Sequence, residues 1–287
     1  MTPYWQSPDG RHTLFCADCL ALLPALTAGS VDAVVTDPPY GQSNESYDRG
    51  VKPEVWAECF RVAGPVSALL SFAGNSTYHR IATGIEQAAW KVRQMWGWVY
   101  RNGFMTSAYP TEGYDRLAPA MDPICFAAKG KLLLNLSKEG NKTWTRKRNK
   151  GEVCTWSERA GKCAGEGVGK WPRAVVSDGM APFEYFALNP NSPALAGSKA
   201  GHPNQKPIAL MEWILWKLPS VTILDPFAGS GTTLVACVRT GRRSIGVEID
   251  PKYCAIAVQR MERELAQPTF QYADVAPQLE AATLFGE

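Results

Sequence analysis

Short apolar runs alternate with segments of helical spacing along most of the chain. The run Val31–Thr36 is rich in β-branched residues and stops at a turn, which is typical of a buried parallel strand. Similar strands are predicted at residues 13–18, 66–72, 221–225 and 244–248, with a strand pair at 92–100 and 123–128. Helices are predicted at residues 19–26, 53–61, 78–89, 208–218, 232–240 and 253–266. Because strands and helices alternate, we expect an α/β fold with a mostly parallel sheet covered on both faces.

The alternation is interrupted between residues 136 and 195. This stretch is rich in Gly, Pro, Trp and basic residues and shows no clear period. Order returns with the helix predicted at residues 208–218. We therefore expect one domain in two halves, residues 1–135 and 196–266, separated by an inserted region at 136–195 and followed by a C-terminal tail at 267–287.

Positive charge is concentrated in the inserted region. The 287 residues carry a net charge of +3, yet the stretch from Lys138 to Arg173 holds ten Lys and Arg against four Glu. The rest of the chain is therefore close to neutral, and a single basic segment is typical of a nucleic-acid-binding protein. A solvated basic loop is the alternative interpretation. The candidate nucleic-acid contacts interleave charge with an aromatic ring: Lys142, Trp144, Arg146, Lys147, Arg148, Lys150, Arg159, Lys170 and Arg173.

Apolar runs and cysteines bear on the class of protein. No run approaches the length needed to cross a bilayer, and residues 1–11 lack the apolar stretch of a signal peptide, so a soluble cytoplasmic protein is expected. Cys16 and Cys19 form one CxxC pair, but a zinc site requires a second pair at ligand spacing. Cys154 and Cys163 are nine residues apart and do not provide it, so we expect reduced thiols and no bound metal.

A glycine-rich turn, Asp-Pro-Phe-Ala-Gly-Ser-Gly at residues 225–231, follows a predicted strand and opens a predicted helix. Glycines allow a sharp turn and allow a ligand to lie against the backbone. Glu248 lies seventeen residues after Gly231, at the end of the next strand, where an acidic group suits hydrogen bonding to a ribose. Neither GxGxxG nor a P-loop is present here, so the turn indicates a nucleoside site without a polyphosphate. An ordinary strand-to-helix turn is the alternative.

A rigid turn follows the strand Val31–Thr36. Pro38 and Pro39 each fix their own φ angle, lack an N–H donor and disfavour helical geometry in the residue before them. The turn therefore presents the carboxylate of Asp37, the carbonyl of Pro38 and the ring of Tyr40 at the carboxyl end of a strand, where open α/β sheets bind ligands. Two acceptors beside a flat ring suit an exocyclic NH₂ group on a planar base. A purely structural turn is the alternative.

Together these motifs resemble the amino-group DNA methyltransferases, which modify the N6 of adenine or the N4 of cytosine. Since Asp-Pro-Pro-Tyr precedes the glycine-rich turn, the chain is similar to the permuted beta class of that family. Residues 202–207 (HPNQKP) resemble its HPxQKP segment, which implies that Lys206 pairs with the cofactor carboxylate. The resemblance also implies that Asp18 contacts the adenine of the cofactor and Glu248 its ribose. The implied cofactor-binding residues are Asp18, His202, Lys206, Asp225, Phe227, Gly229, Ser230, Gly231, Thr232 and Glu248, and the implied catalytic residues are Asp37, Pro38, Pro39 and Tyr40.

The resemblance implies a fold, a cofactor and a reaction. The expected fold is a Rossmann-like, seven-stranded methyltransferase sheet with one antiparallel strand, circularly permuted, with a target-recognition region inserted at 136–195. Residues 1–135 would form its catalytic half and 196–266 its cofactor-binding half. The implied cofactor is S-adenosylmethionine, and no metal is required. The implied reaction is direct methyl transfer to the N6 amino group of an adenine flipped out of duplex DNA.

Asp37 favours adenine, since the cytosine branch of the family often has Ser at this position. The alternatives are N4-cytosine methylation on the same scaffold, an RNA or protein amide methyltransferase, and a catalytically inactive DNA-binding module. Intact Asp37 and the intact turn at residues 229–231 disfavour the inactive module. Double-stranded DNA is the implied partner, and the resemblance leaves open a companion restriction endonuclease and a homodimer.

Overall fold

One large sheet forms the centre of the protein. The computed structural model describes residues 2–41, 50–99, 121–132, 134, 145–147, 153–155, 175–177 and 205–267. Within them, nine strands form a sheet in the order β1-β2-β11-β10-β3-β4-β6-β5-β9, and β7 pairs with β8. The strands are β1 (Trp5–Gln6), β2 (His12–Cys16), β3 (Val31–Thr36), β4 (Ala63–Phe72), β5 (Lys91–Val99), β6 (Met121–Lys129), β7 (Thr145–Lys147), β8 (Val153–Thr155), β9 (Val175–Ser177), β10 (Thr222–Asp225) and β11 (Arg243–Glu248).

The sheet is mostly parallel. β2, β11, β10, β3 and β4 run in one direction, whereas β6 runs antiparallel to both of its neighbours, β4 and β5. The expected seven-stranded sheet with one antiparallel strand is therefore confirmed, and its spatial order is β2-β11-β10-β3-β4-β6-β5. β1, antiparallel to β2, and β9, parallel to β5, extend this sheet by one short strand at each edge.

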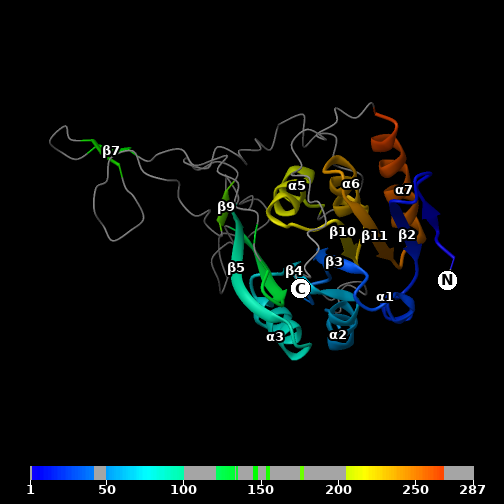
Figure 1. The fold of residues 1–287 in the computed structure, drawn as a ribbon, viewed down its shortest axis with the longest axis horizontal. Helices are drawn as coiled ribbons and strands as arrows, with labels where there is room; N and C mark the ends of the chain where they lie inside the picture. Colours follow the sequence, from blue (N-terminus) through cyan, green and yellow to red (C-terminus); the bar gives the residue numbers. More distant parts are fainter. Residues whose placement is uncertain are drawn as a thin grey trace, which may run out of the picture.

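In the part of the chain that the structure describes, three α-helices cover each face of the sheet, and one face also carries a short 3₁₀ helix (Figure 1). One face carries α1 (Cys19–Leu22), η1 (Leu23–Ala25), α2 (Pro53–Val62) and α3 (Tyr78–Gln87); the other carries α5 (Ile208–Lys217), α6 (Thr232–Arg239) and α7 (Pro251–Leu265). Side chains alternate between the faces along each strand. Val34 belongs to the core cluster that contains Trp56 of α2, whereas its neighbour Val35 belongs to the cluster that contains Ile214 of α5. The predicted burial of both faces is therefore confirmed.

The predicted elements agree with the structure in type, and most differ by a few residues at their ends. β3 has the predicted bounds. The helix predicted at residues 253–266 begins earlier, at Pro251, because Asp250 caps it by accepting from the backbone N–H of Lys252. The helix predicted at residues 19–26 is divided into α1 and η1, and Pro24, which has no N–H to donate, lies within η1. No helix in the described part of the chain has the length and apolar character needed to span a membrane.

Candidate active site

The diproline turn and the glycine-rich turn begin side by side. β3 and β10 are parallel neighbours in the sheet, so the residues that follow them emerge at the same edge. The hydroxyl of Thr36 donates to Oδ1 of Asp225 at 2.7 Å, and this bond joins the last residues of the two strands. Asp37 follows Thr36 directly. The structure therefore brings together two motifs that lie nearly 190 residues apart in the sequence.

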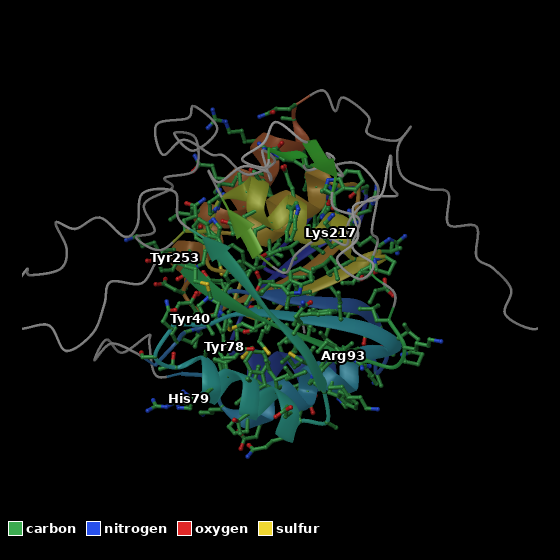
Figure 2. The ribbon with its side chains drawn as sticks, turned by 90° about the vertical axis from the view of Figure 1, so that its left-hand side faces the viewer. Tyr40, Tyr78, His79, Arg93, Lys217 and Tyr253 are labelled. Carbon is green, nitrogen blue, oxygen red and sulfur yellow. The ribbon has the colours of Figure 1, made fainter. Side chains whose placement is uncertain are left out.

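Four neighbouring strands place an acidic residue at this edge. Asp18 follows β2, Glu248 and Asp225 end β11 and β10, and Asp37 follows β3. Figure 2 shows the edge from the side: Tyr40 and Tyr253, which follow β3 and β11, lie on one side of the molecule. Lys217 and Arg93 lie on the opposite side (Figure 2). Open α/β sheets bind their ligands at the carboxyl ends of their parallel strands. This end of the sheet is therefore the candidate active site, and we call it the active-site edge.

Asp37 is held by two donors. The hydroxyl of Tyr40 donates to Oδ1 of Asp37 at 2.5 Å, and Nζ of Lys206 donates to Oδ2 at 2.8 Å. The same Nζ lies 3.0 Å from the hydroxyl of Tyr40. The Asp37 side chain is 28% exposed, so the carboxylate stays accessible to a ligand while its orientation is fixed. The stiff backbone at Pro38 and Pro39 adds to this fixed orientation.

Lys206 occupies a position that the sequence did not predict. Its side chain is 7% exposed, and Nζ lies 3.7 Å from Oδ2 of Asp122 as well as beside Asp37. Nζ is also 5.1 Å from the ring centroid of Phe72 and 5.4 Å from that of Tyr40, within cation–π range. The structure shows the ammonium paired with the carboxylate of Asp37, and the contact with a cofactor carboxylate that the HPxQKP resemblance implied stays a prediction. His202, from the same segment, lies outside the described residues.

The glycine-rich turn depends on glycine at two positions. Gly229 and Gly231 have φ angles of +52° and +80°, in the left-handed region that glycine adopts at no steric cost. A Cβ on Gly231 would lie 2.9 Å from Cβ of Ala257 on α7, so this glycine allows the helix to approach closely. A Cβ on Gly229 would meet no described atom within 4 Å and would project into open space. A ligand can therefore lie against the backbone at Gly229.

Glu248 joins the end of β11 to the glycine-rich turn. Its Oε2 accepts from the backbone N–H of Gly229 at 2.8 Å, and its Oε1 accepts from that of Asp250 at 2.8 Å. Burial raises the pKa of Glu248, although the N–H donors oppose this shift. Each carboxylate oxygen has two lone pairs, so Glu248 can also accept from the hydroxyl groups of a bound ribose.

Asp18 and Asp225 also help to build the edge. Oδ1 of Asp18 accepts from the N–H of Leu20 at 2.8 Å, and Asp18 thereby caps α1. Burial raises the pKa of Asp225 to about 6, against the opposing effect of hydrogen bonds from Thr233, Thr36 and the N–H of Phe227. Asp225 therefore fixes the start of the two turns, and its predicted contact with the cofactor stays a prediction.

Arg260 on α7 stabilises the glycine-rich turn through hydrogen bonds. From α7, its Nη1 donates to the carbonyl oxygen of Ser230 at 2.5 Å and lies 3.0 Å from the Ser230 hydroxyl and 3.2 Å from the Thr232 hydroxyl. Neither Arg260 nor Asp122 was among the residues predicted from the sequence. A signal for Asp122 does exist, because the first residues of an antiparallel strand lie at the edge where its parallel neighbours end.

Most of the predicted DNA contacts lie outside the described residues. Arg146 and Lys147 belong to β7, whose backbone pairs with β8. Lys142, Trp144, Arg148, Lys150, Arg159, Lys170 and Arg173 are outside the described ranges. The assignment of this basic segment to DNA stays a prediction.

Six cysteines are free thiols: Cys16, Cys19, Cys59, Cys125, Cys237 and Cys254. Across the described ranges, no group of three or more His, Cys, Asp and Glu side chains could hold a metal ion.

Known proteins resemble this chain over most of its length. The family profile of the N6/N4 DNA methylases matches residues 31–259. The DNA adenine methyltransferase YhdJ of Escherichia coli (strain K12) is 26% identical over 265 residues, which cover 87% of this chain and 82% of YhdJ. The crystal structure of M1.HpyAVI in complex with SAM has a TM-score of 0.56 at 23% identity and covers 87% of this chain and 99% of that one. The cytosine-N4-specific PvuII DNA methyltransferase has a TM-score of 0.60 at 16% identity and covers 92% of each chain. The two structural matches show a common fold.

Proposed function

The chain belongs to the N6/N4 family of DNA methylases, and we propose that it methylates the N6 amino group of adenine in duplex DNA at a specific site. One observation carries the proposal: Asp37 and Tyr40 lie at the end of β3, directly beside the glycine-rich turn that follows β10. An acceptor for an amino group and a turn suited to a nucleoside therefore begin side by side at the same end of the sheet.

The described residues fit S-adenosylmethionine, the methyl donor of this family. Gly229 leaves open space in front of the turn, and Glu248 lies beside it with acceptor capacity for a ribose. We assign Asp18, which follows the neighbouring strand β2, to the adenine end of the cofactor. When bound, S-adenosylmethionine supplies a methyl group that its sulfonium makes electrophilic.

The residues of the diproline turn would prepare the amino group. The amino nitrogen of adenine is a weak nucleophile because its lone pair is delocalised into the ring. Hydrogen bonds from the NH₂ group to the Asp37 carboxylate and the Pro38 carbonyl favour a tetrahedral nitrogen with an available lone pair. The ring of Tyr40 stacks on the base and holds it in line. Catalysis then depends on positioning and electrostatics, without a covalent enzyme intermediate.

The target base must leave the duplex, because its amino group is paired and stacked there. We assign the basic residues between Lys142 and Arg173 to the phosphate and base contacts that hold the remaining DNA. The inserted region at 136–195 is then the target-recognition region, between a catalytic half at 1–135 and a cofactor-binding half at 196–266.

N4-cytosine methylation is the second candidate function. The observation in its favour is the fold of the PvuII enzyme, which has the higher TM-score of the two structures compared above. The observation against it is Asp37, because the cytosine branch of the family often has Ser at this position. Both candidates use the same turn and the same cofactor.

Analysis of the methylated product distinguishes the two functions. DNA from cells that express the protein is digested to nucleosides, and the modified nucleoside is identified by mass spectrometry, while sequencing of modified bases gives the recognition site. The proposal expects N6-methyladenine at one motif. N4-methylcytosine would establish the second candidate, and unmodified DNA from cells with folded, cofactor-binding protein would exclude both.

A further inference from the structure

Lys206 pairs with the carboxylate on which the proposed reaction depends. Its Nζ donates to Oδ2 of Asp37 at 2.8 Å and lies 3.7 Å from Oδ2 of Asp122. The side chain is 7% exposed, and aromatic rings from Tyr40 and Phe72 lie beside the ammonium. One buried cation is therefore shared by two carboxylates from different strands.

The ammonium and a target amino group would compete for Asp37. Both are nitrogen donors, and Lys206 already donates to Oδ2 while Tyr40 donates to Oδ1. During methyl transfer the amino nitrogen gains positive charge, and a second cation on the same carboxylate opposes that charge. Asp37 therefore stabilises the transition state best when the ammonium has moved away from it.

A buried cation cannot leave one carboxylate without a second partner, because an unpaired buried charge is strongly unfavourable. Asp122 meets this need. β6 runs antiparallel to β4, so its first residues lie at the edge where β3 and β4 end. The N–H of Ala73 donates to the carbonyl of Pro123 at 3.0 Å, which fixes the start of β6 at this edge. The Asp122 side chain is 17% exposed and already lies within ion-pair distance of Lys206.

We propose that Lys206 and Asp122 are an exchange pair that regulates access to Asp37. Lys206 holds Asp37 and Tyr40 in position and shifts to Asp122 as the target amino group takes over Oδ2 of Asp37. Both are positioning residues, because they act through Asp37. This inference rests on the proposed function, since it needs an amino group as the incoming donor.

A double-mutant cycle tests the exchange in the full-length protein. Asp122→Asn keeps the shape of the side chain but removes its charge, so Lys206 stays at Asp37 and the single-turnover rate of methyl transfer should fall roughly tenfold. The affinity for S-adenosylmethionine should stay within about twofold of wild type. Adding Lys206→Met removes the trapped ammonium, so the double variant should be roughly fivefold faster than Asp122→Asn alone. Asp122→Glu, which keeps the charge, is the matched control and should retain a rate within about threefold of wild type.

The outcomes are distinct. A double variant that is as slow as Asp122→Asn, or slower, would overturn the exchange, because a residue with only a structural role is not rescued by removal of its partner. A wild-type protein that transfers no methyl group to DNA would instead contradict the proposed function.

A second measurement covers the case in which Asp122→Asn does not fold. On DNA with 2-aminopurine at the mapped target position, Lys206→Met should increase the fluorescence change that reports base extrusion, because Asp37 has lost a competing donor. A smaller change than in wild type would also overturn the exchange.

Discussion

Three glycines with left-handed backbone angles allow backbone strain, packing and cofactor binding to be separated. The φ angles are +52° at Gly229, +80° at Gly231 and +69° at Gly241, which lies in the turn between α6 and β11. A Cβ at Gly231 would lie 2.9 Å from Cβ of Ala257, whereas a Cβ at Gly229 or Gly241 would meet no described atom within 4 Å. Alanine at the three positions therefore introduces a similar backbone strain. Its Cβ would be packed against α7 at Gly231, would lie beside the candidate cofactor site at Gly229, and would be open and distant from that site at Gly241.

The size of each effect follows from these surroundings. An alanine in the left-handed region costs about 1–2 kcal/mol, and the stiffer unfolded chain offsets ~0.4–1 kcal/mol of that. Gly229→Ala and Gly241→Ala should therefore each lower the free energy of unfolding by roughly 1 kcal/mol. Gly231→Ala also overpacks the contact with Ala257, which typically costs ~1–3 kcal/mol, so its total should be roughly 2–4 kcal/mol.

Cofactor affinity should follow a different order from stability. The Cβ of Gly229→Ala would project into the space assigned to S-adenosylmethionine and should weaken its binding by about tenfold, or ~1.4 kcal/mol. Gly241→Ala lies in a turn at the opposite end of α6 from the glycine-rich turn and should bind the cofactor as wild type does. Urea unfolding gives the stabilities, and titration calorimetry of the folded variants gives the affinities.

Two results would refute this reasoning. If Gly231→Ala unfolds no more easily than Gly241→Ala, the close approach of α7 to the turn does not matter for stability. If Gly229→Ala keeps wild-type affinity, the cofactor does not lie against the turn where we place it.

Other predictions address the carboxylates at the active-site edge. Asp37→Asn should bind S-adenosylmethionine with unchanged affinity in calorimetry yet lose methyl transfer, and near-normal turnover would remove Asp37 from the mechanism. Thr36→Val removes a donor from buried Asp225 and should lower the free energy of unfolding by about 1–3 kcal/mol in urea, with Thr27→Val as a control at an exposed position. Burial raises the pKa of Asp225 to about 6 and lowers that of His12 to about 4. Between about pH 4 and 6, which lies between the native and unfolded pKa values of each group, the native state binds more protons than the unfolded chain at Asp225 and fewer at His12. In this window ionisation of Asp225 therefore lowers the free energy of unfolding as the pH rises, whereas deprotonation of His12 raises it. Asp225→Asn should thus make the free energy of unfolding rise with pH in this window, and His12→Gln should make it fall, as measured by urea unfolding at each pH.

The sequence allowed the centre of the sheet to be predicted because its signals there are local. β3 is rich in β-branched residues and ends at the diproline turn, and its predicted limits are the observed ones. The adjacency of the two turns also followed from the family resemblance, and the Thr36–Asp225 bond shows it directly. The permuted class and the domain boundaries stay predictions.

The partner of Lys206 could not be predicted, because it depends on how three distant segments meet. Lys206 precedes α5, Asp37 follows β3, and Asp122 lies near the start of β6. No local sequence signal indicates whether the Lys206 ammonium pairs with a carboxylate of the protein or with the carboxylate of a cofactor. The edge strands β1 and β9 were missed for a simpler reason, since two or three residues are too few to show a period.

The acidic residues at the active-site edge connect stability with function. Asp18, Glu248, Asp225 and Asp37 lie at the ends of four adjacent strands. Burial is the main cause of the raised pKa of Asp225, and the nearby charge of Asp37 adds to it. Three of them are satisfied by backbone N–H groups or hydroxyls, which supply partial charges. Asp37 instead pairs with a full cation, Lys206. An edge with this excess of negative charge favours positively charged ligands. The same negative charge suits the sulfonium of S-adenosylmethionine. It also explains why the ammonium of Lys206 lies beside Asp37, at the position that we assign to the target amino group.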